Sequence, residues 1–166
     1  VFARGGGRRD PFGKVPAAAE GHRHTGLAPS VALHIPWDRV DDYDELRAHA
    51  EDLGVRLGTI NTNTFQDDDY LLGSLCHVDE RIRAKAIGHA LDCVVIMDAT
   101  ASRDLKVWLP DGLNYPGQGD LRGRQDRLAD SLAQIYERLA DHQRLVPEYK
   151  FFEPAFYATD VPDWGT

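Results

Sequence analysis

Hydrophobic positions along this chain fall into short strand-like runs separated by longer stretches with helical spacing. Four apolar runs predict strands, at 30–36, 55–61, 105–109 and 145–152. The intervening stretches predict helices, at about 41–53, 79–100 and 120–141. Strands that alternate with helices are typical of a parallel sheet with helical crossovers.

Capping residues and breakers set the expected element ends. Asp38 or Asp41 is expected to cap the helix that closes at Gly54, and Asp79 is expected to cap the next one. Residues 1–16 are rich in Gly and Arg and contain two prolines, so they are expected to form an extended arm, with a short helix at 17–24. Residues 1–30 therefore form an arm and helix, and 31–166 the main unit.

The fourth predicted strand carries an unusual set of charges. Glu148 and Lys150 share one face of this strand because side chains alternate, while Tyr149 lies on the other face. A carboxylate and an ammonium on a buried strand are costly unless they are paired or hold a ligand. A surface ion pair is the alternative, but the apolar neighbours favour a functional site.

Other polar and aromatic residues also stand at predicted strand ends: His34, Asn61, Asn63 and Trp108. Sites built from the carboxyl ends of several strands are the rule in (β/α)8 barrels. A flavodoxin-like open sheet is the alternative, although no Gly-rich phosphate loop follows the first strand. Four βα units make half a barrel with two open edges. A second half is then needed, from further sequence or from another copy.

Composition narrows the function classes. The chain has 166 residues, 42% hydrophobic, with a net charge of −8 and a pI near 5.3. This acidity disfavours nucleic acid as a partner, no apolar run approaches a membrane span, and the cytoplasm is the expected compartment. Cys76 and Cys93 lack metal-site spacing, and Cys93 is expected in the core. Because Val1 stands where a Met would start a chain, we expect a piece of a longer protein.

The chain resembles a known family in stretches that span nearly its whole length. The pattern Glu-x-Lys-x-x-Glu-Pro at 148–154 is similar to that of the xylose-isomerase-like barrels. Three further stretches resemble the bacterial L-rhamnose isomerases of broad aldose specificity: 28–37, 61–70 and 108–118. The resemblance implies a xylose-isomerase-like (β/α)8 TIM barrel, of which this chain holds the first four βα units.

The resemblance also implies a role for each matched residue. Glu148 would bind the metal, and Lys150 would hydrogen-bond a sugar oxygen near the reacting carbon. His34 would assist ring opening, and Trp108 would pack against the sugar carbons. Taken alone, such a His or Trp is more often structural. Weaker candidates for polar groups of the pocket are Asn61, Asn63, Asp68 and Asn114. The run Asp67–Asp69 is expected to be a solvated loop or a helix cap.

The implied activity is the metal-dependent interconversion of L-rhamnose and L-rhamnulose. The resemblance implies two divalent ions per complete site. Mn²⁺ is the preferred ion, and Mg²⁺, Co²⁺ and Zn²⁺ are alternatives. Family members supply further Asp and His ligands from later strands, so the 166 residues alone are expected to be inactive. The implied partners are sugars and other copies of the chain, in a homotetramer. Two alternatives remain: a related sugar isomerase or ketose 3-epimerase, and a non-catalytic half-barrel.

Overall fold

The main sheet consists of four parallel strands in chain order. A computed structural model describes residues 10–109, 112–113, 117–149 and 158–159. The sheet order is β1-β2-β3-β5, and the strands are β1 (Ser30–Ile35), β2 (Arg56–Thr62), β3 (Asp104–Leu109) and β5 (Arg144–Tyr149). This order contains no reversal point, so it matches a segment of a barrel and not the flavodoxin-like sheet. The predicted parallel sheet is confirmed.

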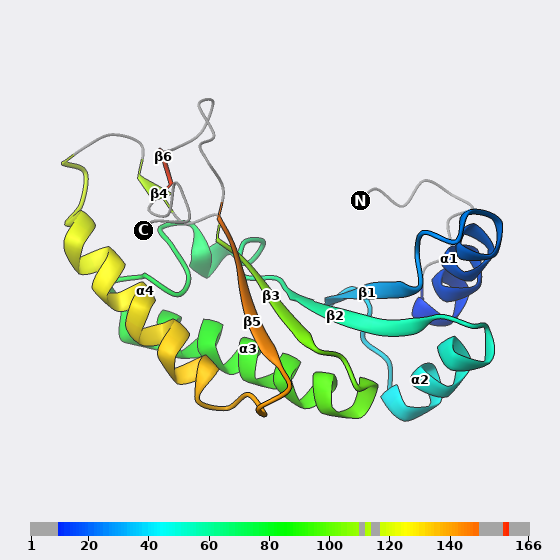
Figure 1. Cartoon of the computed structure of the whole chain (residues 1–166). Helices are drawn as coiled ribbons and strands as arrows, with labels where there is room; N and C mark the ends of the chain where they lie inside the picture. The colour runs from blue at the N-terminus through cyan, green and yellow to red at the C-terminus, as the bar shows by residue number, and fades with distance from the viewer. Residues whose placement is uncertain (1–9, 110–111, 114–116, 150–157, 160–166) are drawn as a thin grey trace.

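Helices connect the strands and pack along one side of the sheet (Figure 1). Figure 1 shows α3 and α4 lying side by side. The helices are α1 (Pro11–Thr25), α2 (Tyr43–Asp52), α3 (Glu80–Thr100) and α4 (Leu121–Tyr136), with a short 3₁₀ helix η1 (Asp68–Tyr70). A separate antiparallel pair joins β4 (Gly112–Leu113) to β6 (Ala158–Thr159). The sequence did not predict this small pair.

Side chains alternate between a buried and an open face of the main sheet. Leu105, Val107 and Leu109 of β3 are buried, whereas the positions between them are only partly covered. We call the more open side the inner face; it carries His34, Asn61, Lys106, Trp108 and Glu148. The strand register places His34, Asn61, Lys106 and Val146 in one row across the four strands. Trp108 and Glu148 are paired two residues nearer the carboxyl ends of their strands.

The core lies between the sheet and the helices. Each fully buried Leu or Ile side chain contributes about 1.5–3 kcal/mol relative to its exposed state. The largest such side chains include Leu33, Ile35, Leu46, Ile60, Leu75, Met97, Leu105 and Ile135. Both cysteines are buried and neither forms a disulfide. Cys93 is fully buried in the core cluster, so the prediction that it is a core residue is confirmed, and this burial raises the pKa of its thiol to about 12.

The first helix is longer than the sequence predicted. It begins at Pro11, so the expected loop over residues 11–16 is wrong. The Asp10 side chain accepts a hydrogen bond from the Gly13 N–H at 2.9 Å and caps the helix. Pro11 suits the first helical position because an N–H there would have no partner within the helix. Val15, fully buried, anchors this helix against the core.

Two other boundaries differ from expectation. Asp42, rather than Asp38 or Asp41, caps α2, because its side chain accepts from the Glu45 N–H at 2.8 Å. The last helix ends at Tyr136 and not near Asp141. Asp79 caps α3 as predicted, through the Arg81 N–H.

Candidate functional site

A buried carboxylate fixes the loop that follows β1. The Asp38 Oδ2 accepts a hydrogen bond from the His34 N–H at 2.8 Å, and the Asp38 N–H donates to the His34 carbonyl at 2.8 Å. Its Oδ1 forms an ion pair with the Lys14 ammonium of α1. Asp38 is buried, so the charge of Lys14 compensates a carboxylate removed from water. This loop therefore holds His34 and Trp37 at the carboxyl end of β1.

Aromatic rings form a continuous row across the carboxyl ends of the first three strands. The ring centroids of His34 and Trp37 lie 5.8 Å apart, and those of Trp37 and Phe65 6.1 Å apart. Phe65 meets Trp108 edge to face at 4.6 Å, a favourable arrangement of two rings. We call His34, Trp37, Phe65 and Trp108 the aromatic row. Two predicted site residues, His34 and Trp108, thus stand at its ends.

Sequence reasoning missed Trp37 and Phe65 as members of the site. Each follows a strand by two or three residues, which is where barrel loops place functional side chains. That position after a strand end was the available signal.

The asparagines at the end of β2 make structural hydrogen bonds. The Asn61 amide donates to the Leu33 carbonyl at 3.1 Å, and Asn63 Oδ1 accepts from the Phe65 N–H at 3.3 Å. The Asn63 N–H donates to Nε2 of His89, on α3, at 3.2 Å. These contacts set the turn that carries Phe65. Asp68 lies in η1, which Asp67 caps, and Lys85 pairs with Asp67 and Asp69, as expected for a solvated capping run.

Glu148 pairs with a lysine of the neighbouring strand. Its Oε2 lies 2.8 Å from the Lys106 ammonium, and its side chain is 46% exposed. The expectation that Glu148 lies on a buried face is therefore wrong for this chain, because no helix covers the inner face within the described residues. Strand alternation around β5 alone could not reveal Lys106, which belongs to β3. Lys150 and Asn114 lie outside the described residues.

The inner face could hold part of a divalent cation site. The Glu148 carboxylate is accessible and already accepts one cationic group, so it fits as one oxygen ligand for a hard cation. The described part of the chain contains no group of three or more His, Cys, Asp or Glu side chains placed to hold a metal. Further ligands would have to come from elsewhere.

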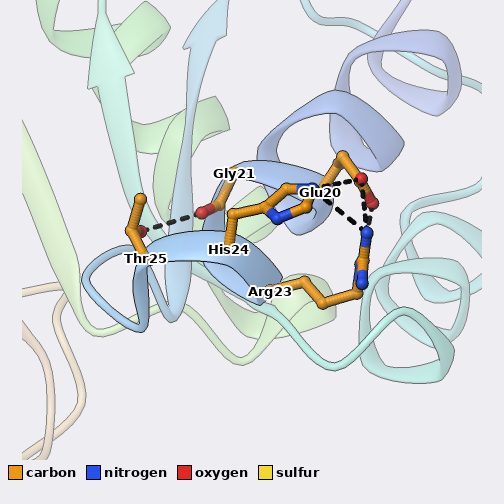
Figure 2. Close-up of polar contacts among 5 residues, drawn as sticks. All are labelled: Glu20, Gly21, Arg23, His24 and Thr25. Carbon is orange, nitrogen blue, oxygen red and sulfur yellow. Dashed lines mark hydrogen bonds and ion pairs between the residues drawn. The ribbon is translucent and has the colours of Figure 1, made fainter.

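A second polar cluster lies at the opposite end of the sheet, on the last turns of α1 (Figure 2). Figure 2 shows the Arg23 and His24 side chains pointing toward the Glu20 carboxylate. Glu20 accepts hydrogen bonds from Arg23 at 2.7 and 3.0 Å and contacts His24 at 2.7 Å. Arg23 first, and then His24, lower the pKa of Glu20 to about 2. The cluster borders a hollow of about 340 Å³ reaching Gly54, just before β2. Side chains at this end of a barrel serve stability rather than catalysis.

The chain is similar in sequence to proteins described as sugar isomerases. No protein-family model matches it. It is 42% identical to a protein of Rhizobium meliloti named "Probable sugar isomerase", over 99% of this chain and 40% of that protein. It is 38% identical to a protein of the same description from Mesorhizobium japonicum, over 99% of this chain and 39% of that protein. The chain thus spans about two fifths of these relatives.

Solved structures confirm the fold. A D-psicose 3-epimerase from Clostridium cellulolyticum aligns with a TM-score of 0.59 at 16% identity, covering 79% of this chain and 45% of that one. A D-allulose 3-epimerase from Methylomonas aligns with a TM-score of 0.61 at 14% identity, covering 91% and 48%. A protein described as a xylose isomerase-like TIM barrel fusion aligns at 0.55 and 15% identity, covering 85% and 20%. The chain folds as a partial xylose-isomerase-like barrel. No helix in the described parts is long and apolar enough to cross a membrane.

Proposed function

We propose that the whole protein is a metal-dependent aldose–ketose isomerase that interconverts L-rhamnose and L-rhamnulose. One observation carries the proposal: Glu148 is paired in register with Trp108 on the face and at the strand ends where the aromatic row begins with His34. A carboxylate beside a row of aromatic rings suits a ligand with oxygens on one side and apolar carbons on the other. The relatives named as sugar isomerases support the substrate class.

Each candidate residue of this chain has a different role in the proposed reaction. In the reaction a hydrogen moves between C2 and C1 while a proton moves between O2 and O1. His34 exchanges a proton with the ring oxygen as the sugar opens. Trp108 and Phe65 cover the sugar carbons and exclude water. Lys150 donates a hydrogen bond to the oxygen that gains charge. Glu148 would help to hold a divalent cation, with Mn²⁺ as the preferred ion. The cation would supply Lewis acidity when bound.

A ketose 3-epimerase is the second candidate. The solved structures that share the fold include an L-ribulose 3-epimerase, at 17% identity and a TM-score of 0.58. An epimerase starts from a ketose and returns a ketose, whereas the proposed isomerase converts an aldose.

A sugar panel on the whole protein separates the two candidates. The protein is stripped of metal, supplied with Mn²⁺, and given L-rhamnose, L-rhamnulose, D-allulose or D-fructose. We expect L-rhamnose and L-rhamnulose to interconvert only with the metal present. Glu148→Gln should remove this activity, while the exposed control Glu137→Gln should keep it. Turnover of the ketoses to other ketoses, with no turnover of L-rhamnose and no aldose product, would overturn the isomerase proposal and favour the epimerase.

A further inference from the structure

The positively charged side chain of Lys106 lies beside the Glu148 carboxylate, which is proposed to bind a metal. Its ammonium lies 2.8 Å from Glu148 Oε2, and its side chain is 37% exposed on the inner face. The two residues belong to different strands and are diagonal neighbours, because Lys106 is paired with Val146 and Glu148 with Trp108. This contact depends on the register of the sheet and not on local sequence.

The core does not need a lysine at this position. On β3 the buried side chains are those of Leu105, Val107 and Leu109, on the helix-covered face. Lys106 projects from the opposite face, in the same row as His34 and Asn61. Local ion pairs within α1 and α2, such as Arg47 with Glu51, instead join residues one turn apart on one helix. The fold of the sheet thus places the Lys106 ammonium in the candidate site.

We propose that Lys106 is an internal counter-ion of Glu148 that competes with the divalent cation for this carboxylate. The inference rests on the proposed function, in which Glu148 is a metal ligand. When no cation is bound, the ammonium neutralises and orients the carboxylate. When a cation binds, the ammonium loses Oε2 or shares the carboxylate with a doubly charged ion. Lys106 therefore weakens cation affinity and favours exchange of the metal.

The sign of the expected effect follows from the charges. Removing one positive charge beside a doubly charged cation lowers the repulsion that opposes binding. The orienting value of a partly exposed ion pair is small by comparison. Lys106→Met should therefore bind the cation about tenfold more tightly. Lys106→Arg, which keeps the charge, should stay within about twofold of the natural protein.

The test measures Mn²⁺ affinity of the whole, metal-stripped protein by calorimetry and by the electron paramagnetic resonance of unbound Mn²⁺. Lys85→Met is the matched control, because it removes the same charge from a surface pair with Asp67 and Asp69. Tighter binding by Lys106→Met alone supports the proposal. Equal or weaker binding, or the same gain in Lys85→Met, overturns it while the proposed function stands. No Mn²⁺ binding by the natural protein overturns the metal role of Glu148 and this inference together.

A second readout follows the ammonium directly. In a titration with Mg²⁺, nuclear magnetic resonance of the lysine Nζ groups should show the Lys106 signal shifting with the saturation of the site. The Lys85 signal should stay in place. A Lys106 signal that does not respond, while Mg²⁺ binds, would show that the cation leaves the pair intact and would contradict the competition.

Discussion

At the scale of single residues, Asp38 shows how a side chain outside the candidate site holds the site in place. Both of its carboxylate oxygens are occupied, one by the His34 N–H and the other by Lys14. The turn after β1, which carries Trp37 and is hydrogen-bonded to His34 near the end of that strand, therefore depends on the charge of Lys14 in α1. Such a residue acts by positioning, since it need not touch a ligand of the candidate site.

The Lys14–Asp38 pair gives a stability prediction. Lys14→Met leaves a buried carboxylate without its cation and should lower the free energy of unfolding by about 1–2 kcal/mol, less than for a fully buried pair because Lys14 is 43% exposed. Lys14→Arg should recover most of the loss. Urea denaturation measures both variants. The control Arg47→Met, which breaks an exposed pair with Glu51, should change the midpoint little. Equal midpoints for Lys14→Met and Arg47→Met would argue against a structural role for the pair.

His89 gives a prediction about pH. Burial, followed by the nearby charge of Arg39, lowers the pKa of His89 below 6.5, while the backbone of Ile35 and the charge of Asp92 act in the raising direction. As pH falls below about 6.5, the unfolded chain takes up a proton before the folded chain does, so stability is lost in that range. The hydrogen bond from the Asn63 N–H also requires an unprotonated Nε2.

The measurement compares urea midpoints at about pH 7.5 and about pH 5.5. We expect a smaller loss at low pH for His89→Gln than for the natural chain. The exposed control His142→Gln should behave like the natural chain. If His89→Gln loses as much stability as the natural chain, another group causes the pH dependence.

At the scale of elements, the N-terminus of α2 offers a direct comparison of neighbouring aspartates. Asp42 caps the helix through the Glu45 N–H, whereas Asp41 does not serve as the cap. Asp42→Ala should cost about 1 kcal/mol of stability, and Asp41→Ala less than about 0.5 kcal/mol. Thermal unfolding of the two variants checks this assignment. A larger loss for Asp41→Ala would return the cap to the position that the sequence suggested.

Elements with strong periodic patterns could be predicted from the sequence, and elements defined by tertiary contacts could not. Asp79 stands alone before a long apolar stripe, so the start of α3 was clear. Three aspartates before α2 made its cap ambiguous. At α1, two prolines resembled a loop, although Pro11 fits the first turn of a helix. The β4–β6 pair joins segments far apart in the chain, and a local pattern carries no signal for that.

The residues of the candidate site also fall into those that the sequence indicates and those that only the folded sheet reveals. Glu148, His34 and Trp108 stand out in the sequence as candidates because each is a chemically distinctive residue near a strand end, and their functional roles stay a prediction. Lys106 escaped notice because its significance comes from the register between β3 and β5, which only the folded sheet defines.

At the scale of the whole molecule, the inner face remains open within the described residues, and one carboxylate there is not a complete metal site. The chain also spans about two fifths of its curated relatives. We therefore expect the isolated 166-residue chain to show no turnover of L-rhamnose, and the whole protein to be active with Mn²⁺. Assay of the two proteins side by side, with their size in solution, checks this. Turnover by the isolated chain would refute the prediction, and a stable metal-free oligomer would favour the half-barrel alternative.

The two buried thiols make the chain its own reporter of local opening. Cys93 lies within α3, and Cys76 lies in the segment between η1 and α3. Because both thiols are buried, each reacts with a thiol-reactive dye only when its own part of the molecule opens. If Cys76 reacts faster than Cys93, that segment opens without unfolding α3. If both react at one common rate, the helix and the segment open together. The labelling rates would thus divide the chain into its cooperative units without any substitution.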